Sequence, residues 1–460
     1  MPKQMTAEQK LTYMTETPLP RLVLSLSVPT IVSMLITSFY NMADTYFVGL
    51  IGSASASGAV GVAFPLMAIM QAVGFMFGHG SGNHMARVLG AGDAADARKM
   101  AATGFFSAFF VGLAIMTIGL LAAEPLAYAL GSTPTIAPYA MEYLGYLMPG
   151  APFLIASLVL NNQLRFQGSA FYAMIGITSG AVLNIILDPL FIFTFGMGVA
   201  GAALATSLSQ VVSFFLLLNG TRLGGNIRIY WRDYTPTLAN FREILRGGVP
   251  SLARQSLNSL ATVCLNLASG GYGDAAIAAM SIVTRVMMMT VSAIIGFGQG
   301  FQPICGFNYG AGLYERVRRA FWFCVRLCFC VLVLVSAAAI ALAPQIISLF
   351  LAADPQVQEI GTLALRLQCA LIPLFAFTCL SNMMLQTMGI AGRATVLAMA
   401  RQGLFFIPAV WVLEHAFGLL GVQLAQPVAD VLSFLLAIPL TLPVLRRLRE
   451  SEAAKKVSKT

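Results

Sequence analysis

The chain has 460 residues, of which 58% are hydrophobic and only 10% are charged, and its formal net charge is +9. A soluble domain carries roughly 25% charged residues, so this composition and a mean hydropathy of +0.80 exclude a soluble globular protein. Charge-free runs such as 101–123 and 327–343 can each cross a bilayer, which takes about 20 residues. We predict an all-α polytopic membrane protein.

Twelve apolar segments are predicted as transmembrane helices. They lie near residues 22–48, 55–80, 100–123, 137–160, 171–195, 199–220, 247–270, 275–303, 319–343, 358–383, 394–415 and 420–444. The polar residues before Pro18 lack the apolar centre of a cleavable signal peptide, so we expect the first span to remain in the membrane.

The connections between these segments alternate in charge. One set carries basic residues, such as Arg98, Lys99 and Arg318, whereas connections such as 124–136 and 344–357 contain neither Lys nor Arg. By the positive-inside rule the basic set faces the cytoplasm, and so do both termini. We therefore predict a multi-pass protein of the cytoplasmic (inner) membrane.

The second half of the chain repeats the first. The segments that match after a shift of 220 or 221 residues are 78–92 with 296–312, 28–29 with 249–250, 165–170 with 386–391, and 198–205 with 418–425. An even number of spans per half makes the halves parallel, a plan in which a pseudo-twofold axis runs along the membrane normal and the substrate path lies between the halves. The predicted units are an N-terminal tail (1–20), an N-lobe (21–220), a cytoplasmic linker (221–246), a C-lobe (247–445) and a basic tail (446–460).

Two aspartates lie inside predicted spans of the first half, where ionisable groups are costly and usually functional. Asp44 ends a polar stripe on the first span that also contains Ser33, Thr37 and Asn41. Asp188 lies four residues after Asn184.

Pro189 has no N–H to donate, so it leaves a backbone carbonyl free beside Asp188. Oxygen ligands suit a small hard cation, and a buried carboxyl can equally carry a proton. Further polar residues follow at Tyr143, Asn161, Thr206 and Gln210. Alternatively, Ser33, Thr37 and Gln210 only link helices through hydrogen bonds.

The second half lacks these acids. Position 44 corresponds to Leu265, and the spans of this half instead contain several arginines and Asp430. Arg254, Arg366 or Arg401 either pairs with Asp430 or lines the substrate path, and the sequence leaves both readings open. The seven cysteines and the three histidines form no metal signature. We expect no cofactor or resident metal, and the short loops argue against an enzyme.

The segments "NMADTYFVG" (41–49), "LNIILDPLFIF" (183–193) and "GVAGAALATSLSQ" (198–210), with the paired glycine loops, resemble the multidrug and toxic compound extrusion (MATE) family. The resemblance covers about residues 21–445 and is greatest to the bacterial branch of DinF-like and MepA-like exporters. It implies two lobes in a V and cation-coupled export of bulky, often cationic drugs. The coupling residues that it implies are Asp44, Tyr143, Asn161, Asn184, Asp188 and Thr206. The NorM-like branch has acids in spans seven and ten, where this chain has Arg254 and Arg366, so second-lobe cation binding is not expected.

The predicted function is secondary antiport: an organic cationic or amphiphilic drug leaves in exchange for H⁺ or Na⁺ by alternating access, which would confer antibiotic resistance. A sodium ion would bind at Asp44, Asn184, Asp188 and Thr206. The candidate residues of the substrate path are Thr37, Asn41, Gln210, Arg254, Arg366 and Arg401. The alternative is a flippase or exporter of a lipid-linked or amphiphilic metabolite. We expect a monomer that contacts membrane lipids and binds no nucleic acid.

Overall fold

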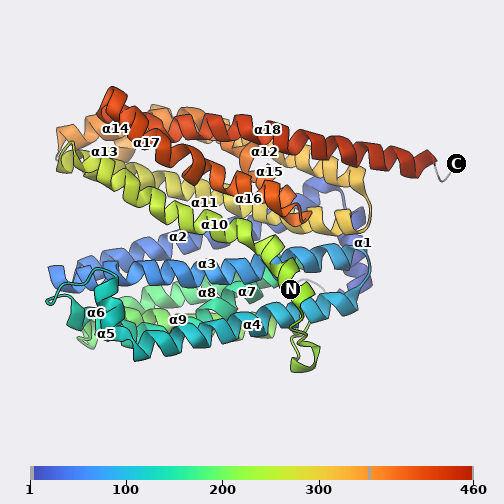
Figure 1. The fold of residues 1–460 in the computed structure, drawn as a ribbon, viewed down its shortest axis with the longest axis horizontal. Coiled ribbons are helices and arrows are strands. Elements are labelled where there is room, and N and C mark those ends of the chain that lie inside the picture. The colour runs from blue at the N-terminus through green and yellow to red at the C-terminus, as the bar shows by residue number, and fades with distance from the viewer. Residues whose placement is uncertain (1–4, 351–353, 458–460) are drawn as a thin grey trace.

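The computed structural model describes residues 5–350 and 354–457, and over these ranges the chain is helical without a strand. Figure 1 shows long, nearly parallel helices in two groups that lie side by side. The first group consists of α2 (Leu19–Gly49), α3 (Ala54–Gly90), α4 (Ala94–Leu121), α5 (Ala123–Ala129), α6 (Ala137–Leu147), α7 (Ala151–Phe166), α8 (Ala170–Pro189) and α9 (Gly198–Gly220). This group is the N-lobe.

The C-lobe follows after residue 237 and has the same plan. It consists of α10 (Leu238–Gly270), α11 (Asp274–Gly310), α12 (Tyr314–Ala341), α13 (Ala343–Ser348), α14 (Pro355–Leu371), α15 (Phe375–Thr387), α16 (Ala391–Met399), α17 (Ile407–Phe417) and α18 (Leu419–Val457). Short 3₁₀ turns join α6 to α7 and α14 to α15, and π-helical segments follow α8 (Leu190–Thr194) and α16 (Ala400–Phe406).

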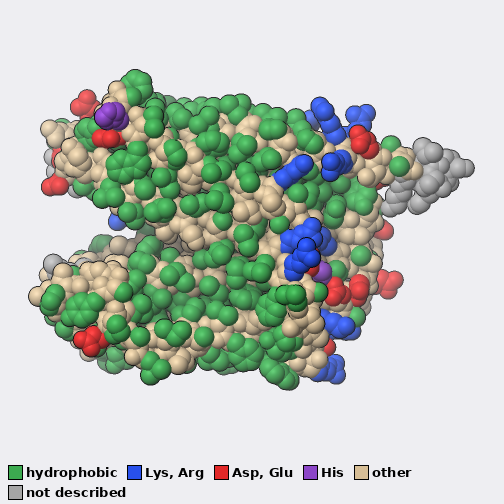
Figure 2. All heavy atoms as spheres, in the orientation of Figure 1, with side chains coloured by type: hydrophobic (Ala, Val, Ile, Leu, Met, Phe, Trp, Pro, Cys, Tyr) green, Lys and Arg blue, Asp and Glu red, His purple; other side chains and the backbone are tan. Residues whose placement is uncertain are grey.

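Twelve predicted spans appear as helices in this twelve-helix, two-lobe fold. Among the described residues, eleven helical segments are long and apolar enough to cross a membrane. The segment predicted at 247–270 is helical within α10 but is not one of the eleven, because residues such as Arg254, Gln255 and Asn258 make it more polar. Figure 2 agrees with a membrane protein, since apolar side chains cover the middle of the surface and charged side chains gather at its two ends.

Parts of the segments predicted as tails are helical. Part of the N-terminal tail forms α1 (Ala7–Glu16), and α18 continues to Val457 through the predicted basic tail. Helix α10 begins at Leu238, within the segment predicted as the linker, and Trp231 of the same segment packs against Phe106 of α4 with 4.8 Å between ring centroids. Residues 1–4 and 458–460, the outer ends of both predicted tails, lie outside the described residues.

The buried apolar side chains form one main cluster in each lobe, and the cluster of the C-lobe extends to N-lobe residues such as Leu22 of α2. Met100, Leu144 and Leu160 belong to the core of the N-lobe, and Phe321 and Leu365 belong to that of the C-lobe. The lobes meet where α3 packs along α10 and α2 packs along α11. In Figure 2 a notch separates the lobes at the end of the molecule opposite the C-terminus.

The end of the molecule nearest the C-terminus is closed by close helix contacts. A Cβ atom on Gly80, Gly90 or Gly310 would overlap a backbone carbonyl of the opposing helix. The repeated glycines, predicted as loops, therefore lie mostly within α3 and α11, where this close approach of the helices explains them. Side chains also join the lobes there, since Arg165 Nη1 donates to Gln299 Oε1 over 2.6 Å and Thr387 Oγ1 to Asn83 Oδ1 over 2.8 Å.

Candidate functional site

A cavity of about 80 Å³ with a largely apolar wall and several polar residues lies inside the N-lobe among α2, α3, α7, α8 and α9. Its polar lining consists of Ser33, Thr37, Tyr40, Gln71, Asn161, Asn184, Thr206, Gln210 and Ser213. The helical spacing of four residues brings Ser33 and Thr37 to one face of α2, as predicted. Their hydroxyl groups donate to carbonyls of the preceding turn, Ser33 to Pro29 and Thr37 to Ser33, which satisfies the donors inside the helix.

Asn184 is the centre of the site. Its Nδ2 lies 3.4 Å from Asp188 Oδ1 and 3.3 Å from Thr206 Oγ1, so one amide contacts an acid of α8 and a hydroxyl of α9. Asp188 has no exposed surface, and Asn184 and Thr206 are also buried. The structure thus brings together three of the four residues predicted to bind sodium.

Asp44, the fourth of these residues, approaches the same centre from α2. It interacts electrostatically with Asp188, and the hydroxyl groups of Tyr40 and Tyr143 interact with both acids. Asp44 is one helical turn beyond Tyr40, a cavity-lining residue, as Asp188 is one turn beyond Asn184. Two carboxyl groups from separate helices therefore face one polar region.

Three buried oxygen atoms of this region have no hydrogen-bond partner among the described residues: Asp44 Oδ1, Asn184 Oδ1 and Asp188 Oδ2. Buried polar atoms are nearly always satisfied, so each unpaired acceptor needs a proton, a water molecule or an ion. Carboxylate and amide oxygens are ligands that a hard cation takes. No group of three or more His, Cys, Asp or Glu residues that could hold a metal occurs in the described ranges, so a resident transition metal has no ligand set there.

Asn161 and Tyr143 have other contacts. Asn161 Nδ2 donates to the carbonyl of Ala173 over 3.0 Å and so ties α7 to α8. Tyr143 Oη lies 3.9 Å from Met67 Sδ, a weak contact that leaves the hydroxyl near the acids. Asn41, also predicted to lie on the substrate path, is partly buried on α2 but does not line the cavity.

The three arginines of the C-lobe that were predicted as candidates have different surroundings. Arg401 forms an ion pair with Asp430 at 2.6 Å, and the Asp430 side chain is buried. Arg366 is largely exposed and donates to the carbonyl of Ile340. Arg254 interacts electrostatically with Arg165 and His79, and no hydrogen bond or ion pair joins it to another residue in the described part of the chain.

Two residues of the site were missed in the sequence. Tyr40 lines the cavity and interacts with both aspartates, and Gln71 lines it from α3. Tyr40 lies four residues before Asp44, and Gln71 is a polar residue within an otherwise apolar run. Both signals could have been used, but aromatic residues are frequent and Gln often only links helices.

The fold and the site define a class: a membrane transporter of two repeated lobes with a pair of acids in one lobe. The MatE family model matches residues 29–190 and again residues 250–412, one match in each lobe and together more than half of the chain. The chain belongs to the MatE family, the MATE transporters, as the sequence motifs predicted.

Relatives of known name extend over almost the whole chain. The multidrug export protein MepA of Staphylococcus haemolyticus (strain JCSC1435) is 27% identical over 97% of this chain and 98% of its own. MepA of Staphylococcus aureus (strain NCTC 8325 / PS 47) is 28% identical over 94% of this chain and 95% of its own. These matches agree with the expected MepA-like branch.

Solved structures have the same fold. The crystal structure of a MATE transporter in complex with MaL6 superposes with a TM-score of 0.90 at 26% identity, over 96% of this chain and 99% of that one. A MOP superfamily transporter from Pyrococcus furiosus, described as having a binding pocket of reverse polarity, gives 0.88 at 26% identity over 97% and 99%.

Proposed function

We propose that this protein is a secondary antiporter that exports organic drugs, cationic or amphiphilic, in exchange for H⁺ or Na⁺ carried by the N-lobe. The observation that carries the proposal is the pair Asp44 and Asp188, which interact deep in one lobe and leave carboxylate oxygens unpaired. An ionised carboxylate in a membrane costs about 2.5–3.5 kcal/mol even on the lenient insertion scale. A bound cation or proton would offset that cost.

In the proposed cycle, cation binding and drug binding favour different arrangements of the lobes. The notch of Figure 2 would be the side from which the drug leaves, and the contacts Arg165–Gln299 and Asn83–Thr387 would break when the other side opens. A ligand shifts such an equilibrium only through its different affinity for the two states. The cation would supply that difference by joining α2 to α8 through Asp44 and Asp188.

The drug and the ion would use different volumes. Pockets for drug-sized ligands measure about 300–1,000 Å³, whereas the N-lobe cavity measures about 80 Å³. In this conformation the cavity suits an ion and its water, and a drug would need the space between the lobes or a widened cavity. The relatives named as multidrug export proteins support a broad substrate range.

We propose that the protein is a monomer in the inner membrane and that both of its termini face the cytoplasm. This topology rests on the positive-inside rule and on the gathering of Lys and Arg side chains at the end of the molecule nearest the C-terminus in Figure 2. The notch then faces the outside.

A second function, export of a lipid-linked or amphiphilic metabolite with an acidic group, is favoured by one observation. The guanidinium groups of Arg165 and Arg254 interact with each other near the meeting of the lobes, and no described carboxylate pairs with either. An acidic substrate group could provide the missing counter-charge. Loss of acidic-amphiphile transport in Arg254→Gln, with dye transport retained, would favour this function.

The decisive test uses the purified protein in liposomes with a proton gradient or a sodium gradient imposed separately and ethidium as the reporter. Ethidium movement driven by one gradient supports antiport and identifies the ion. Movement that responds to neither gradient would overturn the proposal. Asp188→Asn, measured beside the parent protein, tests the site assignment independently of the substrate.

A further inference from the structure

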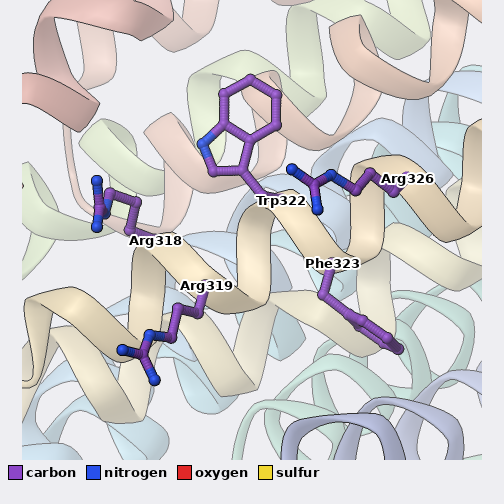
Figure 3. A pocket seen from close by; sticks show the side chains of 5 residues that line it. All are labelled: Arg318, Arg319, Trp322, Phe323 and Arg326. Carbon is purple, nitrogen blue, oxygen red and sulfur yellow. The ribbon is translucent and has the colours of Figure 1, made fainter.

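A basic pocket lies on the outer surface of the C-lobe, away from the proposed ion site. It measures about 360 Å³ and is lined by Arg318, Arg319, Trp322, Phe323 and Arg326, all on α12. Figure 3 shows these five side chains projecting from this one helix, with Arg326 beside Trp322. Steps of three and four residues place them on neighbouring faces of the helix.

The depth of this pocket follows from the length of α12. The helix has 28 residues, about 42 Å at 1.5 Å per residue, and the hydrocarbon core of a bilayer is about 30 Å thick. Counting about 20 residues back from Ala341 places Trp322 at the boundary of the hydrocarbon core and Arg326 one turn inside it. Arg318 and Arg319 then lie at the level of the lipid headgroups.

The face that carries Arg326 is turned to lipid. Phe329, Val333 and Leu334 follow on α12, and all three are exposed. Trp322 is fixed on the protein side of the pocket, where its ring packs against Phe321 and Phe377. Arg326 is therefore an exposed cation at the edge of the hydrocarbon core beside an aromatic residue that favours the membrane interface.

The pocket has an excess of positive charge. Glu315 accepts from Arg318 at 2.8 Å and from Arg319 at 3.0 Å, so one carboxylate is shared by two guanidinium groups. Arg326 forms no hydrogen bond or ion pair with any residue in the described ranges. A guanidinium in this position is costly unless it reaches water or an anion, and its long side chain can extend toward the headgroup level.

We propose that this pocket binds the phosphate of an anionic phospholipid in the leaflet on the side of the termini. Arg326 and the charge left over from Arg318 and Arg319 would contact the phosphate, and Trp322 and Phe323 would pack against the glycerol and the upper acyl chains. A lipid fits better than free phosphate, because the apolar walls of the pocket continue directly into the lipid-facing surface of α12. The proposal does not depend on which ion drives transport.

The three tryptophans of the chain allow a direct test. In a Trp231→Phe/Trp411→Phe background, Trp322 is the remaining tryptophan and lies in the pocket itself. The full chain is reconstituted in vesicles of phosphatidylcholine and phosphatidylglycerol, with either lipid brominated on its acyl chains. Quenching of Trp322 fluorescence then reports how often each lipid occupies the pocket.

We expect phosphatidylglycerol to be enriched about fivefold over phosphatidylcholine at Trp322, the effect of one basic residue near anionic lipid. Arg326→Gln should abolish the enrichment, so that both lipids occupy the pocket about equally. Arg319→Gln should lower the enrichment as well. Arg446→Gln, which removes an exposed charge outside the pocket, is the matched control and should leave it unchanged.

Three results would overturn the proposal. The first is equal quenching by both brominated lipids in the parent background. The second is an enrichment that Arg446→Gln lowers as much as Arg326→Gln does, which would indicate diffuse surface attraction. The third is displacement of the lipid by inorganic phosphate at constant ionic strength, which would assign the pocket to a soluble anion. In vesicles made of brominated phosphatidylcholine alone, where no lipid competes, quenching equal to that of the parent background verifies that each variant retains the fold around Trp322.

Discussion

In the N-lobe, Asn161 donates to the carbonyl of Ala173; in the C-lobe, Asn382, 221 residues later, donates to the carbonyl of Ala394, the equivalent of Ala173. The same bond thus ties two helices together in the lobe that contains the acids and in the lobe that lacks them. A contact that survives without the acids belongs to the framework of the repeat. This comparison favours a structural role for Asn161 over the coupling role that family resemblance implied.

The centres of the two lobes differ. The N-lobe cavity is lined by Leu154, Gly180 and Gln210, which correspond through the repeat to Phe375, Arg401 and Asp430. In the C-lobe the guanidinium of Arg401 lies 4.1 Å from the ring centroid of Phe375 and pairs with Asp430.

In the C-lobe, side chains therefore occupy the place that corresponds to the cavity of the N-lobe. Gly180 lets α8 pack closely against Ser213 of α9 beside the cavity, whereas Arg401 at the equivalent position of the C-lobe extends to its counter-ion Asp430. The comparison teaches that the repeat supplies the frame of this transporter, and that a few substitutions make the centres of the two lobes different, which is the basis of the proposed ion site in the N-lobe.

Among the tests of this difference between the lobes, Asp188→Asn is expected to have the largest effect on transport. The substitution removes a carboxylate from the proposed ion site and retains its shape. Because coupling between two ligands typically amounts to about 5- to 150-fold in affinity, gradient-driven ethidium transport should fall by about tenfold or more. The measurement is transport in liposomes per amount of folded protein.

Asp430→Asn is the matched control, since it changes the buried acid of the other lobe. It should retain the response to the gradient. Loss of coupling in Asp430→Asn together with normal coupling in Asp188→Asn would reverse the assignment of the ion to the N-lobe.

The second test removes the ion pair that fills the C-lobe. Arg401→Ala leaves the Asp430 carboxylate buried without its partner, and breaking a buried pair in this way costs about 3–5 kcal/mol of stability. Thermal unfolding in detergent should show a clearly lower midpoint. The double variant Arg401→Met/Asp430→Leu should recover most of it, because apolar residues can replace a buried pair.

This double variant also tests whether the pair has only a structural role. If it unfolds at the normal temperature but no longer couples transport to the gradient, the charges of the C-lobe take part in the cycle. The comparison of an open N-lobe with an inert C-lobe would then be wrong.

The third test uses the repeated asparagines. Asn161→Ala and Asn382→Ala each remove one buried hydrogen bond between two helices, which contributes about 0.5–1.5 kcal/mol, so the two variants should lose similar stability. If Asn161 only holds the framework, both should keep the same ion dependence of transport. A changed sodium or proton dependence in Asn161→Ala alone would restore its role in coupling.

The sequence was sufficient to predict the two-lobe plan and to propose the region of the candidate site, because both leave periodic or local signals. The shift of 220 or 221 residues indicated the repeat, and acids such as Asp188 are conspicuous in apolar helices. The pairing of Arg401 with Asp430 could not be chosen over Arg254 or Arg366, since spacing within a helix does not determine which helices pack together. The ordered α1 was missed because a short polar helix gains its stability from tertiary contacts.

The last test concerns the segments that precede the two lobes. The C-lobe is preceded by a segment that Trp231 anchors through aromatic contacts, whereas α1, before the N-lobe, is held by a buried Lys10 that donates to Asn226. Burial lowers the pKa of Lys10 from 10.5 to about 7. Between these values the unfolded chain binds more protons than the folded one, so stability should rise as the pH increases from about 7 toward 10.

Lys10→Met removes the titrating group and keeps an unbranched side chain at the same place. The unfolding midpoint of the parent protein should rise by a few degrees over that pH range relative to the variant, and the difference should level off below pH 7, where both states of the parent are protonated. A parallel pair of curves would mean that Lys10 remains hydrated in the folded protein. For Trp231→Phe, the curve of unfolding midpoint against pH should run parallel to that of the parent protein, since aromatic contacts do not titrate. This result would distinguish the aromatic contacts before the C-lobe from the buried lysine before the N-lobe.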